Sequence, residues 1–259
     1  YFEIPLMRNT RVYTDRLLSE ALEKGQLIRL EPMGSAHIIK VLRMRAGALV
    51  TLFNGDGFDY SAEIETPKPE AAELRLINKR INAAESSLKI TLIQALCRGE
   101  KMDWLLEKVT ELGVHRIVPV QTERTEVQLD ADRALKRLQH WQRVVISACE
   151  QCGRARVPEI LSLLNLDARL ALNPVFGLAW ALEPHSPSFT QQLNGVDPLK
   201  SSAEIHIAIG PEGGFSDRDL AQLAAAKFQS VSFGPRILRT ETAGVTALAI
   251  LQSKWGDLK

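Results

Sequence analysis

Short runs of alternating apolar and polar residues fill the first third of the chain and predict β-strands. They cover residues 27–31, 48–53, 58–65 and 72–81, and the turn-forming sequences NGDG and TPKPE separate the last three. A short helix is predicted after the first strand, in HIIKVLRMRAG at residues 37–47. We therefore expect a small β-rich barrel with one inserted helix. Residues 1–6 precede Met7, which looks like a natural start, so we place this domain at residues 7–82.

The pattern changes after NAAESS at residues 82–87, which is small and polar as a linker would be. Strands are then predicted at residues 88–96, 116–120, 175–183, 204–210 and 230–233, and helices at residues 101–113, 131–151, 216–227 and 241–255. Strands that alternate with helices at this spacing imply a mostly parallel sheet covered on both faces. The sequence thus predicts an α/β domain over residues 88–259.

Composition describes an ordinary globular protein. Of the 259 residues, 45% are hydrophobic and 24% are charged. No run approaches the ~20 apolar residues of a membrane span, and the N-terminal region lacks the apolar centre of a signal peptide. We therefore expect a cytoplasmic protein with no membrane contact.

The cysteines Cys97, Cys149 and Cys152 are too few, and odd in number, for a disulfide framework. Cys149 and Cys152 form a C-x-x-C, which is compatible with a redox or zinc site, but no second Cys/His pair lies at metal-ligand spacing. A helix-packing role is the simpler interpretation, and we expect no metal.

Two local clusters of basic residues suggest a nucleic-acid partner, although the formal net charge is only +1. One lies in HIIKVLRMRAG, where basic side chains share one face of the predicted helix, and the other follows the helix at residues 131–151. Each cluster is either a phosphate-binding surface or a solvated helix face. The candidate RNA-binding residues are Lys40, Arg43, Arg45, Arg137, Arg143 and Arg154.

The sequence IHIAIGPEGGFSDRDL at residues 205–220 joins an apolar strand to a helix that opens with Ser216. Loops in this position bind ligands in α/β proteins. The glycine spacing matches neither a Walker loop nor G-x-G-x-x-G, and the carboxylate of Glu212 would repel a phosphate. A neutral or cationic ligand therefore fits this loop better.

A second loop with a Gly-Pro sequence after a predicted strand lies in SFGPRILRTETAGVTALAI at residues 232–250. Gly234 follows a strand, and Thr240 and Glu241 stand where an N-cap and a first-turn acid would start the last helix. Glycine lets backbone groups approach a flat heterocycle such as adenine. Either loop alone is compatible with a plain tight turn, but two such loops, with Arg236 and Arg239 in the second, favour a binding site.

The pair IGPEGGFS and FGPRILRTETA resembles the signature of the RsmE family, the ribosomal RNA N3-uridine methyltransferases of the knotted SPOUT superfamily. The likeness extends to HIIKVLRMRAG, to RGEKMDWLLEKVTELGV at residues 98–114 and to RVVISACEQCGRARVPEI at residues 143–160, so it covers most of the chain. Phe233 departs from the leucine that is more frequent in the family. This departure would alter one wall of the pocket and not the chemistry.

The resemblance implies an N-terminal PUA-like β-barrel that binds RNA, a C-terminal SPOUT-type α/β domain with a trefoil knot, and a homodimer. It also implies S-adenosylmethionine as cofactor and, as substrate, N3 of a uridine in 16S ribosomal RNA, either naked or in the assembled small subunit. The cofactor-binding residues that it implies are Leu182, Glu183, Gly210, Pro211, Glu212, Gly213, Gly214, Phe233, Gly234, Ile237, Leu238, Arg239 and Thr240.

Arg239 and Glu241 are our candidates for the chemistry. N3 of uridine must lose its proton before it attacks, and a fixed cation beside the flanking carbonyl oxygens would stabilise the uridinate. We expect Arg239 to supply that cation. Glu241 would orient the guanidinium group or accept the proton through a water molecule. The alternative is a salt bridge between the two residues that only fixes the loop.

The last predicted helix carries apolar residues on more than one side, which exceeds what a monomer surface needs to bury and predicts a symmetric dimer. These residues include Val245, Leu248, Ala249, Ile250 and Trp255.

Two other functions remain compatible with the sequence. One is a related SPOUT enzyme that acts on transfer RNA, and the other is a non-catalytic ribosome-assembly factor with the same fold.

Overall fold

The computed structural model describes residues 10–194, 196 and 204–258 of the chain. The first six residues, and the start that we expect at Met7, lie outside this part. The chain divides into two compact units, one formed by Tyr1–Glu85 with Cys149–Val157 and the other by Ser86–Ala148 with Pro158–Lys259. The first unit is therefore discontinuous, because it combines the N-terminal region with a segment from the middle of the chain.

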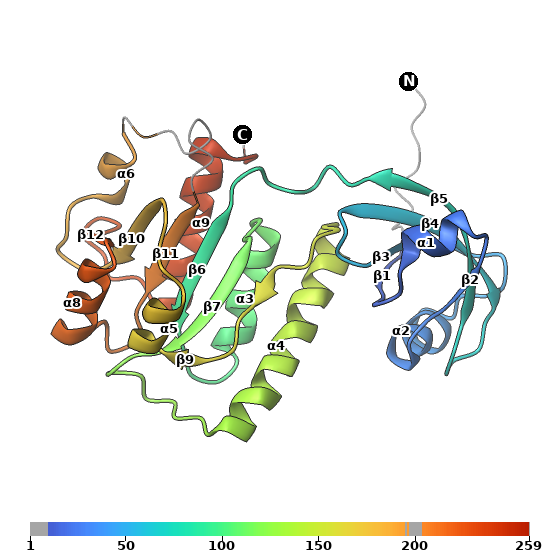
Figure 1. The fold of residues 1–259 in the computed structure, drawn as a ribbon, viewed down its shortest axis with the longest axis horizontal. Helices are drawn as coiled ribbons and strands as arrows, with labels where there is room; N and C mark the ends of the chain where they lie inside the picture. The colour runs from blue at the N-terminus through green and yellow to red at the C-terminus, as the bar shows by residue number, and fades with distance from the viewer. Residues whose placement is uncertain (1–9, 195, 197–203, 259) are drawn as a thin grey trace. The chain divides into compact units, whose positions relative to one another are not determined.

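The first unit is built on an open, curled sheet with the strand order β1-β3-β4-β5-β2 (Figure 1). Its strands are β1 (Arg11–Tyr13), β2 (Leu27–Arg29), β3 (Leu49–Phe53), β4 (Phe58–Thr66) and β5 (Glu73–Ile81). β1 is parallel to β3, and the other neighbours are antiparallel. Tyr60, Ala62 and Ile64 alternate along β4 and pack with Leu52 and Leu74 in one apolar core. The four strands predicted here are confirmed, and β1 is added.

The helical region of the first unit differs from the prediction. Its elements are α1 (Leu18–Glu23), which the pattern did not predict, α2 (Pro32–Ala36) and a π-helix (His37–Val41). The helical backbone ends before Arg43, whose φ of 55° lies in the left-handed region. Lys40 is therefore on the helical segment and Arg43 is not, so these two residues do not share the helix face that the spacing predicted.

Buried polar contacts hold the segment Cys149–Val157 within the first unit. Arg154 Nη2 lies 3.0 Å from Glu85 Oε2, and the two side chains are 6% and 17% exposed. Arg11 Nη2 donates to the carbonyl oxygen of Arg154 at 3.0 Å, while Arg11 Nη1 pairs with Asp59 at 2.8 Å. Arg154, which was predicted to contact RNA phosphates, is thus turned into the unit and away from solvent.

The second unit contains a parallel sheet with the strand order β12-β10-β11-β6-β7-β8, and β9 also pairs with β7. The strands are β6 (Ile90–Ala95), β7 (Arg116–Gln121), β8 (Glu159–Ile160), β9 (Leu164–Asn165), β10 (Leu178–Leu182), β11 (Ile205–Ile209) and β12 (Gln229–Val231). The helices are α3 (Lys101–Glu111), α4 (Ala131–Cys152), α5 (Leu166–Leu172), α6 (Phe189–Gln192), α8 (Asp217–Ala225) and α9 (Thr240–Trp255). The predicted parallel α/β arrangement is confirmed.

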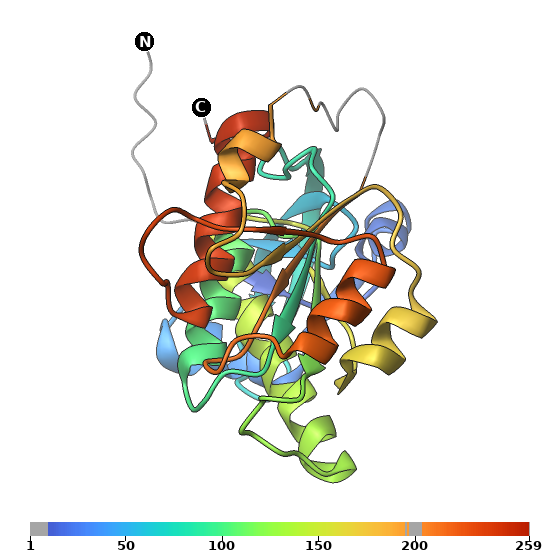
Figure 2. The same cartoon turned by 90° about the vertical axis from the view of Figure 1, so that its left-hand side faces the viewer.

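Helices cover both faces of this sheet (Figure 2). Ile93 on β6 belongs to an apolar cluster with Leu166 of α5 and Leu223 of α8. On the opposite face, Gly244 of α9 lies close to Leu92, Gln94 and Leu105. Because neighbouring residues of a strand point to opposite faces, β6 contributes to both layers. β6 is therefore buried along its whole length and is mostly apolar, with Thr91 and Gln94 as its only polar residues.

α8 begins where the sequence predicted. Ser216 Oγ accepts the backbone N–H of Asp219 at 3.1 Å, and Asp219 Oδ2 accepts the backbone N–H of Ser216 at 2.9 Å. This capping box satisfies N–H groups that the helix itself leaves unpaired.

Within the described ranges, no helix combines the length and the apolar character needed to cross a membrane.

We expect Arg154→Met to lower the free energy of unfolding by about 3 kcal/mol, because it leaves the Glu85 carboxylate buried without its cation. Urea unfolding followed by circular dichroism measures this change. Arg75→Met is the control, since Arg75 and Glu65 form a more exposed ion pair, for which we expect about 1 kcal/mol or less. The double variant Arg154→Met/Glu85→Met should recover much of the loss. A double variant no more stable than Arg154→Met would contradict this assignment.

Candidate functional site

The loops after β6, β10, β11 and β12 emerge at one edge of the second sheet. β12, β10, β11 and β6 are successive parallel neighbours, so their carboxyl ends point the same way. In an open α/β sheet this is the edge at which ligands bind. Both glycine loops singled out in the sequence start here, which supports their interpretation as parts of one site.

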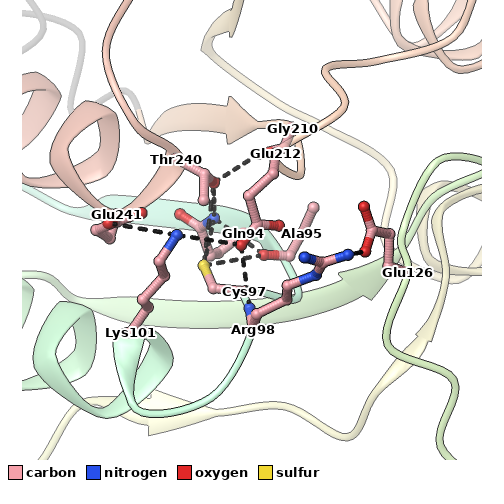
Figure 3. A network of polar contacts seen from close by, with 10 residues as sticks. All are labelled: Gln94, Ala95, Cys97, Arg98, Lys101, Glu126, Gly210, Glu212, Thr240 and Glu241. Atoms are coloured by element: carbon pink, nitrogen blue, oxygen red, sulfur yellow. Dashed lines mark hydrogen bonds and ion pairs between the residues drawn. The ribbon is translucent and has the colours of Figure 1, made fainter.

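The hydroxyl group of Thr240 joins the two glycine loops to β6 (Figure 3). Thr240 Oγ1 donates to the carbonyl oxygen of Gly210 at 2.6 Å, and it accepts from Gln94 Nε2 at 2.9 Å. Thr240 is 5% exposed and Gln94 is fully buried. The prediction that Thr240 is the N-cap is wrong, because Arg239 occupies that position and Thr240 is the first residue of α9. Its hydroxyl group serves a contact between loops and not the helix end.

A charged cluster lies beside this junction. Lys101 Nζ lies 3.5 Å from Glu212 Oε1 and 3.7 Å from Glu241 Oε1. Glu212 also accepts the backbone N–H of Arg98 at 3.2 Å. Partial burial acts to raise the pKa of Glu212, but the backbone N–H donors and the Lys101 ammonium group outweigh it and lower that pKa. Glu212 is therefore held as a carboxylate.

Glu241 differs from Glu212 in its burial. Glu241 is 9% exposed, and its Oε2 atom has no hydrogen-bond partner among the residues that the structure describes. A buried carboxylate oxygen without a donor is unfavourable and calls for an explanation. This oxygen is a candidate acceptor for an N–H or a cationic group of a ligand.

The glycines of the first loop allow close approach of backbone groups. A Cβ atom on Gly210 would lie 3.1 Å from the backbone nitrogen of Phe215, and one on Gly213 would lie 3.3 Å from the Arg124 side chain. Arg124 Nη1 in turn donates to the carbonyl oxygen of Gly213 at 3.1 Å. Gly214 has a φ of 70°, in the region that side chains disfavour. Gly210 and Gly213 thus let the loop pack closely on itself and on Arg124, whereas a Cβ atom on Gly214 would meet nothing within 4 Å.

The remaining predicted cofactor residues lie at the ends of β10 and β12. Leu182 ends β10, and the backbone N–H of Glu183 donates to the carbonyl oxygen of Val231 at 2.9 Å. Burial raises the pKa of Glu183, and Arg124 opposes this shift. Phe233 packs edge-on against Phe189, with ring centroids 5.3 Å apart. In the same part of the molecule, Pro211 is buried, Leu238 is partly buried, and Gly234 and Ile237 are exposed.

The expected pairing of Arg239 with Glu241 is not observed. Arg239 is exposed, and the ion-pair partner of Glu241 is Lys101. Among the described contacts, Glu241 makes no hydrogen bond and no salt bridge with the Arg239 guanidinium group. Glu241 therefore neither orients Arg239 nor fixes the loop through it. Arg239 thus projects from the loop that carries Gly234, independently of Glu241.

The predicted RNA-binding residues are distributed over both units. Lys40, Arg43 and Arg45 are exposed in the first unit, and Lys40 has a weak contact of 3.9 Å with Glu70. Arg137 and Arg143 are exposed on α4. Arg154 is buried, so it is not part of this exposed basic surface.

Cys97 and Cys149 are buried, and Cys152 is partly buried. Burial raises the pKa of Cys97 and of Cys149 to about 12, so both thiols are neutral at physiological pH. No cluster of three metal-ligating side chains occurs in the part of the chain that the structure describes. Cys97 instead packs beside Gln94 and Thr240 (Figure 3).

Sequence reasoning missed Gln94, Lys101 and Arg124. Gln94 had a signal, since it is the one amide side chain in a mostly apolar strand and must find a buried partner. Lys101 belongs to the RGEK sequence directly after the same strand. No local signal assigns a partner to Arg124, which lies 89 residues from the Gly213 carbonyl that it binds.

Comparisons with known proteins agree with this architecture. Residues 84–252 match a family model described as an RNA methyltransferase domain, and residues 35–77 match an RNA methyltransferase PUA domain. The chain is 35% identical over 245 residues to the ribosomal RNA small subunit methyltransferase E of Buchnera aphidicola subsp. Schizaphis graminum, which covers 92% of this chain and 94% of that protein.

Two similar solved structures carry a ligand. One is a ribosomal RNA small subunit methyltransferase E from Neisseria gonorrhoeae bound to S-adenosylmethionine, with 37% identity and a TM-score of 0.87. The other is a putative methyltransferase from Legionella pneumophila in complex with the same cofactor, with 38% identity and a TM-score of 0.87. Both alignments cover 97% of this chain and 100% of the other chain.

We expect Thr240→Val to destabilise the protein by about 1–3 kcal/mol, because the Gly210 carbonyl and the Gln94 amide lose a buried partner. Urea unfolding measures the loss, and hydrogen exchange of the backbone around residues 210–214 should rise in the same variant. Thr240→Ser keeps the hydroxyl group and is the matched control. Valine keeps the γ-methyl group and loses only the hydroxyl group, so a valine variant as stable as the wild type would show that these hydrogen bonds do not stabilise the protein.

Proposed function

This chain belongs to the ribosomal RNA small subunit methyltransferase E family of RNA methyltransferases, and we propose that it transfers the methyl group of S-adenosylmethionine to N3 of a uridine in 16S ribosomal RNA. The observation that carries the proposal is the junction of the two glycine loops at Thr240. It occurs in a chain that aligns over almost its whole length with relatives solved with that cofactor.

The residues present suit S-adenosylmethionine. Its sulfonium centre supplies an activated methyl group, and its adenine is a flat heterocycle. The residues that would hold it are those of the loop at 210–214, the loop at 233–240 and the pair Leu182 and Glu183. Gly214 and Gly234 have left-handed φ values of 70° and 84°, and a Cβ atom on either would meet nothing within 4 Å. The carboxylates of Glu212 and Glu241 are compatible with a cationic ligand.

Arg239 is our proposed stabiliser of the uridinate. It is an exposed cation in the loop that carries Gly234, and its guanidinium group can reach two carbonyl oxygens in one plane. Glu241 would act as proton acceptor through Oε2, since Oε1 lies near Lys101 and Oε2 has no partner among the described residues. The two residues thus have separate roles in this proposal.

The RNA substrate would be bound by basic residues of both units. Lys40, Arg43 and Arg45 are exposed in the unit that includes the PUA match, and Arg137 and Arg143 are exposed on α4. Contacts between such residues and phosphates increase the affinity for RNA and fix its orientation, whereas contacts with the bases select the nucleotide. Arg154 has a structural role in this proposal.

We also propose a homodimer, the trefoil knot implied by the RsmE resemblance, and a cytoplasmic location, where 16S ribosomal RNA is assembled into small subunits. Leu248 and Trp255 of α9 are buried within the second unit and do not support the dimer. Val245, Ala249 and Ile250 support it, because they are only partly buried and line a groove of about 730 Å³ together with residues of and next to α6.

The direct test incubates the purified protein and S-adenosylmethionine with assembled small subunits, naked 16S ribosomal RNA or transfer RNA from cells that lack this protein. Nucleoside mass spectrometry then identifies the product. N3-methyluridine in 16S ribosomal RNA is expected. Methylation of transfer RNA alone, or cofactor binding with no methylated nucleoside, would contradict the proposal and favour one of the two other functions.

We expect Arg239→Lys to slow methyl transfer by more than about tenfold while leaving S-adenosylmethionine affinity near that of the wild type, because lysine keeps the charge but loses the planar pair of donors. Single-turnover rates at saturating RNA and cofactor, together with calorimetry, separate the two effects. Arg236→Lys, also exposed in the same loop, is the control. Unchanged rates for both Arg239→Lys and Arg239→Ala would exclude Arg239 from the chemistry.

The salt dependence of RNA affinity tests the basic surface. Each of Lys40→Gln, Arg43→Gln and Arg45→Gln should reduce the slope of log affinity against log salt by roughly one unit, and cofactor binding should not change. Lys24→Gln is the control, because Lys24 is exposed in the same unit but paired with Glu20. A triple variant at the first three positions with unaltered RNA affinity would show that the first unit has another role.

A further inference from the structure

One lysine contacts a carboxylate of the first glycine loop and a carboxylate of the helix that follows the second glycine loop. Lys101 is the first residue of α3, Glu212 lies in the loop after β11, and Glu241 lies in the first turn of α9 (Figure 3). The ammonium nitrogen is 3.5 Å from one Glu212 oxygen and 3.7 Å from one Glu241 oxygen. A single cation therefore spans two segments that the proposed function assigns to the cofactor site.

We propose that Lys101 is a positioning residue for methyl transfer, whose ammonium group holds the Glu212 and Glu241 carboxylates, and with them the two loops, in one arrangement. This inference rests on the proposed function, since it assigns Lys101 to the same site.

Helix stability does not explain a lysine at this position. Lys101 is in the first turn of α3, where the positive end of the helix dipole disfavours a cation. Its contacts with carboxylates outside the helix offset that cost. The position is therefore explained by the two loops that Lys101 joins and not by the helix that carries it.

The two carboxylates need a cation between them. Their side chains are 26% and 11% exposed, so water screens their mutual repulsion only in part. Glu212 has the Arg98 backbone N–H as a second donor. Glu241 has no other ion pair within the described residues, so its position depends most on Lys101.

The contact also determines which oxygen of Glu241 is left for a ligand. Lys101 lies beside Oε1, and Oε2 stays buried without a partner in the described part of the chain. Two carboxylates and one ammonium group leave one surplus negative charge, which suits a sulfonium donor. Lys101 thereby orients the oxygen that we propose as the proton acceptor.

The first test needs neither cofactor nor RNA. Hydrogen exchange on the ligand-free protein should increase roughly tenfold in peptides that cover residues 210–216 and 239–243 of Lys101→Met, because both loops lose their shared contact. Lys101→Arg should restore protection. Lys108→Met is the control, since Lys108 lies on the same helix and pairs with Glu111, which is also on α3. Unchanged exchange in Lys101→Met would overturn the proposal whatever the activity of the protein.

The second test uses single-turnover methyl transfer. Lys101→Met should reduce the rate at saturating cofactor and RNA by about tenfold to a hundredfold, and Lys101→Arg should recover most of it. The double variant Lys101→Met/Glu212→Gln should be faster than Lys101→Met, because removal of one carboxylate removes the repulsion. A double variant no faster than Lys101→Met would overturn the electrostatic role. If the wild-type protein itself methylates no RNA, the proposed function fails, and hydrogen exchange alone decides whether Lys101 joins the loops.

Discussion

The hydroxyl group of Thr240 is the contact on which the arrangement of the site depends. It connects the Gly210 carbonyl and the Gln94 amide, which come from different strands or loops and are buried from water. Buried polar groups are stable only when their partners are in place, so the three segments restrict one another. With the loops fixed in this way, Glu212 and Glu241 converge on Lys101 at the rim of the same junction.

Local signals in the sequence predicted the parallel sheet and both glycine loops. The apolar runs reflect strands buried on both faces, and Gly214 and Gly234 indeed have φ values that favour glycine. The pairing of Lys101 with Glu241 could not be predicted in the same way. It depends on how α3 packs against α9, and residues 140 positions apart leave no periodic trace of such a contact. The expectation that Arg239 would be the partner relied on nearness in sequence alone.

The basic residues also show what local sequence patterns cannot predict. A spacing of three or four residues identifies a helix face only while the helix continues, and the helical segment ends before Arg43. Arg154 follows a helix with basic residues along its exposed side, but its carbonyl oxygen and guanidinium group both have partners inside the first unit. The positions of basic residues in the sequence therefore suggested an RNA-binding surface. They could not show which of these residues are exposed and which, like Arg154, form a buried ion pair.

The discontinuous first unit has a consequence for biosynthesis. Glu85 and Arg11 are made early, but the Arg154 groups that they bind are added only after α4 has been translated. Until then, Glu85 lacks its cation, and Arg11 has Asp59 as a partner but not the Arg154 carbonyl oxygen. The N-terminal sheet is therefore incomplete on the ribosome while residues 86–148 of the second unit are being synthesised. Folding of the first unit is completed from the middle of the chain, and a fragment that stops at Glu85 lacks the segment that closes it.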